Sequence, residues 1–231
     1  MPSSVPNKRI RKSPAARRAE IVAAAASVAL TEGLECITLR RVAEELDVRP
    51  GLISHYFPVA DDLVAEAYGT AAASELEELL PADRSGATPT RHLARLLART
   101  TGEAYDDISR LWLNARHLSR YRPALRARVG VQEAAWRDRM EALIRDGVAQ
   151  GEFRTADPLV TAIQILVVLD GLGMLVNSAA TSEDPPAVRR LPVTTAEREL
   201  GLAPGTLGAM PDDSAPTADS GGVGGPRGAA R

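Results

Sequence analysis

Arginine, hydroxyl and aromatic side chains are concentrated over residues 37–57, with the spacing of two short helices joined by a tight turn. Arg40 can form a bidentate hydrogen-bond pair with guanine, which discriminates between bases by about 1–3 kcal/mol. Ser54, His55 and Tyr56 can contact phosphate oxygens, which fix the register of a protein on DNA without reading its sequence. This pattern predicts a helix-turn-helix whose second helix enters a groove of double-stranded DNA.

The predicted DNA contacts come from both helices and from the turn between them. Thr38 is expected to cap the start of the first helix. Pro50 suits the first turn of the second helix, where its missing N–H costs nothing. For Arg41 and Arg49 two interpretations stay open, a phosphate contact and a purely solvated position. The complete predicted set is Thr38, Arg40, Arg41, Arg49, Gly51, Ser54, His55 and Tyr56.

Apolar spacing predicts how these helices are held in place. One face of a 3.6-residue period in the first helix is formed by Leu39, Val42, Ala43 and Leu46. In the second helix Ile53 and Phe57 are one turn apart and can both point inward. That helix is too short to be stable alone, so packing must hold it. A preceding helix over residues 15–32, ended by Gly33, supplies the surface with Ile21, Ala25, Val28 and Ala29.

The helix over residues 15–32, the TLRRVAEELDV helix, the GLISHYF helix and the ADDLVAEAY segment together resemble the N-terminal domain of TetR-family regulators. GLISHYF is most similar to the branch of the choline-responsive repressor BetI, and the resemblance is specific over residues 17–67. It implies an all-helical homodimeric repressor that releases a palindromic operator when a small-molecule inducer enters the C-terminal domain. One departure is Val59-Ala60-Asp61, since many members carry a Lys at the opening of this helix. A common phosphate contact is then absent or made by backbone N–H groups.

The composition fits a helical protein, and the positive charge that could attract nucleic acid is confined to one segment of the chain. The 231 residues are 45% hydrophobic but only 3% aromatic, so the core must be built from Ala, Leu, Val and Ile. The net charge of −2 gives no general attraction to DNA. The first twenty residues are different, because Glu20 is the only acid among six basic residues, Lys8, Arg9, Arg11, Lys12, Arg17 and Arg18.

The expected organisation is all-α with two domains. A flexible basic arm covers residues 1–14, the helix-turn-helix domain 15–60, a helical regulatory and dimerisation domain 61–203 and a disordered tail 204–231. The C-terminal helices are predicted at about 61–80, 90–106, 108–120, 123–150, 158–180 and 194–202. Residues 81–89 read as a linker.

Several classes of protein are disfavoured by what the sequence contains. The single Cys36 excludes an intramolecular disulfide and a cysteine-cluster metal site. No nucleophile with a base, metal-ligand spacing of histidines or glycine-rich phosphate loop suggests an enzyme, a metal or a cofactor. No signal peptide is apparent, and polar residues and glycines interrupt the apolar run 159–176, which predicts a buried helix rather than a membrane span. We therefore expect a cytoplasmic protein.

A small-molecule pocket would need apolar walls and a few convergent polar groups. The candidates in the C-terminal half are Tyr105, Trp112, Asn114, Trp136 and Asp170. For the two tryptophans a plain core position is the favoured interpretation and ligand contact is the alternative. His117 and Tyr121 are further candidates, but His117 lies in an Arg-rich run and is expected to be solvated.

Asp170 is the most unusual of these residues, because it follows the apolar run ILVVL. We expect it to pair with an Arg in the core or the dimer interface, and anchoring of a cationic or hydroxylated inducer is the alternative. Breaking a buried pair would destabilise the protein by about 3–5 kcal/mol. Its helix is apolar on all sides and should be buried on both faces, the second against the same helix of another subunit. Gly171 and Gly173 would permit close approach there.

The competing function is a helical interaction or scaffold protein whose helix pair is only structural. DNA binding would depend steeply on salt, whereas a scaffold would show no such dependence.

Overall fold

The computed structural model describes residues 12–101, 106–177 and 186–208, and every regular element within them is helical. The elements are α1 (Pro14–Thr31), a 3₁₀ turn η1 (Leu34–Cys36), α2 (Leu39–Glu45), α3 (Pro50–Tyr56), α4 (Ala60–Leu79), α5 (Pro89–Thr100), α6 (Asp106–Leu118), α7 (Pro123–Ala149), α8 (Pro158–Val176), α9 (Pro186–Arg189) and α10 (Leu191–Glu199). The expected all-α fold is confirmed. Sequence patterning missed only the short η1 and α9. The predicted basic arm falls largely on residues 1–11, outside the described part.

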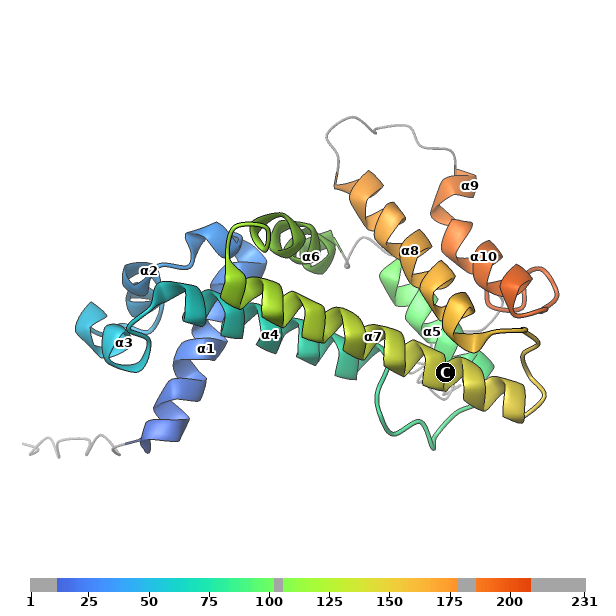
Figure 1. The fold of residues 1–231 in the computed structure, drawn as a ribbon, viewed down its shortest axis with the longest axis horizontal. Helices are drawn as coiled ribbons and strands as arrows, with labels where there is room; N and C mark the ends of the chain where they lie inside the picture. Colours follow the sequence, from blue (N-terminus) through green and yellow to red (C-terminus); the bar gives the residue numbers. More distant parts are fainter. Residues whose placement is uncertain (1–11, 102–105, 178–185, 209–231) are drawn as a thin grey trace, which may run out of the picture.

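The helices form two groups joined by long central helices (Figure 1). α1, α2 and α3 pack together at one end, and α5, α8 and α10 lie at the other. α4 and α7 run side by side between the two groups, and α4 also packs on α1. α6 contacts α1, α4, α7 and α8, so this helix touches both groups.

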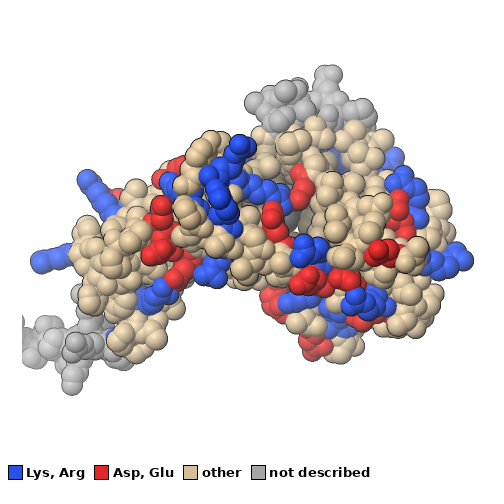
Figure 2. Space-filling model, viewed as in Figure 1, with Lys and Arg blue, Asp and Glu red and all other residues tan. Residues whose placement is uncertain are grey.

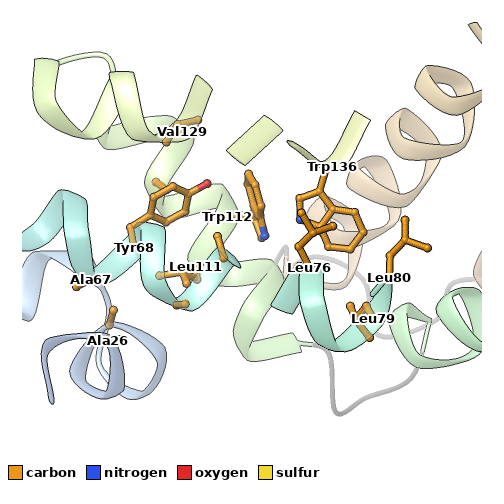
Figure 3. Packing of buried hydrophobic residues seen from close by; sticks show 14 of the residues in the cluster. Ala26, Ala67, Tyr68, Leu76, Leu79, Leu80, Leu111, Trp112, Val129 and Trp136 are labelled. Atoms are coloured by element: carbon orange, nitrogen blue, oxygen red, sulfur yellow. The ribbon is translucent and has the colours of Figure 1, made fainter. Parts of the chain in front are cut away.

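One hydrophobic cluster extends through both groups of helices. Figure 3 shows its central part, where Tyr68 of α4, Trp112 of α6 and Trp136 of α7 follow one another along the interior. All four residues predicted to face inward from α1 are buried. So are the six that form the apolar stripe of α7: Leu125, Val129, Trp136, Met140, Leu143 and Ile144.

The end of the described chain corrects one prediction. The disordered tail was expected from residue 204, but Leu207 is buried in the core. The carboxylate of Glu197 on α10 accepts the backbone N–H of Gly205 at 3.0 Å and that of Leu207 at 2.9 Å. These bonds hold in place a segment that has no apolar period of its own. The composition of the segment therefore wrongly predicted disorder from residue 204. Residues 209–231 lie outside the described chain.

Candidate DNA-binding surface and ligand cavity

The turn between α2 and α3 is built as its residues predict. The Thr38 side chain accepts the N–H of Arg41 at 3.0 Å and caps α2. Pro50 is the first residue of α3, and Ile53 and Phe57 are buried beneath it. The prediction that packing fixes this short helix is thus confirmed.

Packing leaves one side of α3 open to a partner. Gly51, Ser54 and His55 are exposed and Tyr56 is half-buried. The rings of His55 and Tyr56 meet edge to face with centroids 5.2 Å apart. A Cβ on Gly51 would meet no described atom within 4 Å. Packing within the chain would therefore tolerate a side chain at position 51. A glycine there leaves the backbone accessible to a partner.

The two arginines of α2 have different surroundings. The Arg40 side chain is 83% exposed and its Nε donates to Glu44 at 2.9 Å. A pair this exposed contributes little and can be exchanged for another acceptor. Arg41 instead pairs with Glu32 and with Glu45, the latter at 2.8 Å, and these hydrogen bonds raise the pKa of its guanidinium. Arg41 therefore links α2 to the end of α1, while Arg49 is exposed.

A further ion pair joins α1 to α4 beside Phe57, the residue that ends α3. Arg18 of α1 binds the carboxylate of Glu66 on α4 through both terminal guanidinium nitrogens. The same guanidinium lies over the Phe57 ring, 4.6 Å from its centroid. In Figure 2 basic side chains project from the end of the molecule that carries α2 and α3.

The second candidate site is a cavity of about 330 Å³ between α6, α7 and α8. Among the residues around it are Trp112, Arg116, Glu133, Trp136, Val167 and Asp170. Three of the five predicted ligand residues, Trp112, Trp136 and Asp170, are thus brought together. Figure 2 shows the surface hollowed between α6 and α8, with acidic and basic side chains at the rim.

Arg116 occupies the polar centre of this cavity. Its Nε donates to Glu133 at 2.9 Å and its terminal nitrogen to Asp170 at 2.8 Å. The guanidinium carbon lies 5.3 Å from the Trp112 ring centroid, within the range of a cation–π contact. Sequence reasoning missed Arg116 and Glu133. A signal was available, because Arg116 follows Trp112 by four residues and Glu133 precedes Trp136 by three, which places each pair on one helix face.

The structure confirms that Asp170 pairs with an arginine but contradicts its expected burial in the core, while burial in a dimer interface stays a prediction. Its side chain is 50% exposed in the single chain. The reason is the orientation of α8, which turns only Thr161, Ala162, Ile165 and Leu172 fully into the core. Periodicity could not reveal this, because apolar residues occupy every side of the helix.

Two other predicted ligand residues do not belong to the cavity. The Asn114 side chain points to the DNA-binding half, where it accepts the N–H of Leu34 at 3.1 Å and donates to Glu35 at 2.6 Å. The prediction for Asn114 is therefore wrong, because its face of α6 packs on the connection between α1 and α2. Tyr105 lies outside the described residues. His117 does not line the cavity either, and its ring meets that of exposed Tyr121.

The exposed side of α8 is mostly apolar, although it also carries Gln164 and Asp170. It carries five large hydrophobic residues, Leu159, Val160, Ile163, Val167 and Met174. A Cβ on Gly171 would meet open space among the described atoms, so this glycine lies on the free face. Gly173 does not, since a Cβ there would lie 3.4 Å from Ser109 on α6. Of the two glycines predicted to permit close approach to another subunit, only Gly171 is placed to do so.

Two family models match the chain over most of its length. The model of bacterial regulatory proteins of the tetR family matches residues 21–67, and that of the C-terminal part of BetI-type transcriptional repressors matches residues 90–200. The chain belongs to the TetR family. It is a DNA-binding transcriptional regulator with a C-terminal domain of the BetI type. Members of this family are typically not enzymes.

Solved structures show the same fold. A transcriptional regulator from Saccharomonospora viridis in complex with choline is 22% identical with a TM-score of 0.67, over 80% of this chain and 97% of that one. A TetR regulator from Haloarcula marismortui is 20% identical with a TM-score of 0.67, over 80% and 98%. One from a Rhodococcus species is 23% identical with a TM-score of 0.65, over 80% and 98%. No curated protein matches the chain in sequence.

Proposed function

We propose that this TetR-family regulator is a cytoplasmic, homodimeric repressor that releases a palindromic operator when a small organic cation enters the cavity between α6, α7 and α8. The observation that supports the ligand class is the pair of carboxylates, Glu133 and Asp170, beside the indole rings of Trp112 and Trp136. Arg116 neutralises one of the two charges. Arg137 also borders the cavity but lies 3.7 Å from Asp138, which balances it.

Carboxylates beside aromatic walls favour a cation over a neutral molecule of the same shape. The choline bound to the Saccharomonospora viridis regulator is such a cation. Titration calorimetry should therefore detect binding of choline or tetramethylammonium. The matched control is 3,3-dimethyl-1-butanol, in which carbon replaces the choline nitrogen. We expect the alcohol to bind at least about tenfold more weakly, a difference of 1.4 kcal/mol. Equal affinity for the alcohol and choline would contradict the cationic ligand.

The proposed dimer forms through the apolar face of α8. This is the one helix among the described residues with the length and composition of a membrane span, yet it belongs to a DNA-binding fold. An isologous contact would cover its apolar side chains in both copies. Met174→Glu should give monomers in sedimentation velocity, because it buries a charge in the contact. The control is Val131→Glu on α7, which should stay dimeric. Val131 is 57% exposed and Met174 is 58% exposed, so both variants add a charge at a similarly exposed apolar residue. A dimeric Met174→Glu variant would place the interface elsewhere.

Arg40 is proposed to read a base in the groove, and Ser54, His55, Tyr56 and Arg49 are proposed to contact phosphates, with Gly51 at the same surface. Selection from a random DNA library should yield an inverted repeat whose half-sites match a twofold dimer. Gel shifts at two salt concentrations then separate specific binding from the scaffold alternative, which predicts no salt-dependent complex. Recovery of a sequence without inverted symmetry would contradict the palindromic operator.

A further inference from the structure

We infer that Arg116 is a built-in competitor of the ligand, and that its displacement is transmitted through Asn114 to the connection between α1 and α2. The inference rests on the proposed function, because it concerns the same cavity. It adds a residue that sets the affinity of the cavity and a route from the cavity to the DNA-binding half.

The competition follows from the contacts of one guanidinium. Arg116 donates to Glu133 at 2.9 Å and to Asp170 at 2.8 Å, and lies over the ring of Trp112. These three groups are also the ones that an organic cation entering the cavity would use. A side chain and a ligand of the same charge cannot both occupy that position, so the ligand must displace Arg116 from at least one carboxylate.

The ion pairs of Arg116 are exposed enough to solvent that a ligand can replace them. Its side chain is 33% exposed, and the Asp170 and Glu133 side chains are 50% and 45% exposed. Ion pairs with this much solvent contribute little to stability, so exchange for another cation is inexpensive. The cavity beside them has room for a small ligand, at about 330 Å³.

The route to the DNA-binding half runs along α6. Asn114 precedes Arg116 by two residues, roughly 200° around a helix, so the two side chains leave α6 on opposite sides. Asn114 accepts the N–H of buried Leu34 and donates to Glu35. Both belong to η1, which leads into the Thr38 cap of α2. A shift of α6 that follows release of Arg116 therefore pulls on the segment that positions α2.

The backbone of the connection between α1 and α2 has a specific conformation at Gly33. Gly33, which joins α1 to η1, has φ +106°, a conformation that L side chains rarely adopt. The Asn114 bonds and this glycine together fix the direction in which the chain enters α2. Loss of the Asn114 bonds would therefore weaken the attachment of η1 to α6.

The first experiment measures competition with choline and tetramethylammonium as probes. Arg116→Met keeps an unbranched side chain and removes the charge, and we expect calorimetry to show at least tenfold tighter binding of both cations. The control is Arg110→Met, on the same helix, since Arg110 pairs with Asp107 outside the cavity. If Arg116→Met does not fold, Arg116→Gln replaces it. Wild-type binding with no gain in the variant overturns the inference alone. Cation binding by neither protein overturns the proposed function as well.

The second experiment measures transmission with the DNA selected from the random library. Asn114→Ala should bind choline within twofold of the wild type, since Asn114 does not line the cavity. Choline should however no longer release the DNA, so the ratio of DNA affinities without and with choline should fall to near one. Glu35→Ala removes one of the same bonds from an exposed side chain and should reduce the ratio in the same direction. An unchanged ratio in both variants overturns the route through Asn114.

Discussion

Trp112 of α6 donates its indole N–H to Glu75 of α4 at 2.7 Å, and this carboxylate is only 7% exposed. The indole ring also meets the ring of Tyr68 edge to face at 5.5 Å, as Figure 3 shows. α4 follows the recognition helix α3 directly along the chain. One side chain therefore forms a wall of the cavity and a link to the helix that leaves the DNA-binding half.

The Trp112–Glu75 bond should contribute measurably to stability. Trp112→Phe keeps an aromatic ring but removes the donor, and we expect the free energy of unfolding to fall by about 1.5–3 kcal/mol, as for hydrogen bonds to charged groups. Urea unfolding followed by circular dichroism measures this. Glu75→Gln retains an acceptor oxygen and should cost less. A Trp112→Phe variant as stable as the wild type would show that Glu75 finds full compensation elsewhere.

Arg40 is expected to read a base. Arg40→Ala should weaken binding to the selected operator by about 1–3 kcal/mol and relax preference at one base pair per half-site. Competition binding against single-base operator variants measures this. Arg41→Ala is the comparison, because Arg41 is engaged by Glu32 and Glu45 and its loss should act mainly on the stability of α2. If Arg40→Ala weakens all sequences equally, Arg40 contacts phosphate instead.

Local rules predicted the DNA-binding half well and the cavity only partly. A cap at Thr38, a proline at the first position of α3 and two buried residues one turn apart are properties of short segments, so they were readable. The contact between Asn114 and Leu34 spans eighty residues, and the one between Arg116 and Asp170 spans fifty-four. Such pairings depend on which face of α6 and of α8 points to the core. In α8 apolar residues lie on every side of the helix, so the sequence does not indicate which face that is.

Tyr68 carries a hydroxyl that is buried with no hydrogen-bond partner among the described residues. Tyr68→Phe should therefore leave stability unchanged or raise it by up to about 1 kcal/mol, since it removes an unsatisfied polar group. Burial also raises the pKa of Tyr68. The unfolded chain loses this proton near pH 10 whereas the folded chain keeps it, so wild-type stability should decline with pH above about 10. Tyr68→Phe should decline less steeply.

The control for Tyr68 is Tyr121→Phe, because Tyr121 is 73% exposed. This variant should show the wild-type pH dependence, as measured by urea unfolding between pH 8 and 11. A parallel decline in Tyr68→Phe and the wild type would mean that the Tyr68 hydroxyl reaches solvent or a buried base.

Asp170→Asn distinguishes a cavity anchor from a buried structural pair. In the single chain Asp170 is half exposed, and Arg116 would still pair with Glu133. We therefore expect the free energy of unfolding to fall by at most about 1 kcal/mol, as for exposed ion pairs. Loss of a buried pair would lower it by about 3–5 kcal/mol. Choline affinity should fall about tenfold with the lost carboxylate. Asp107→Asn is the control for both readouts, because Asp107 is an exposed partner of Arg110 and neither residue lines the cavity. A loss of 3 kcal/mol or more with conversion to monomers would place Asp170 in the dimer interface.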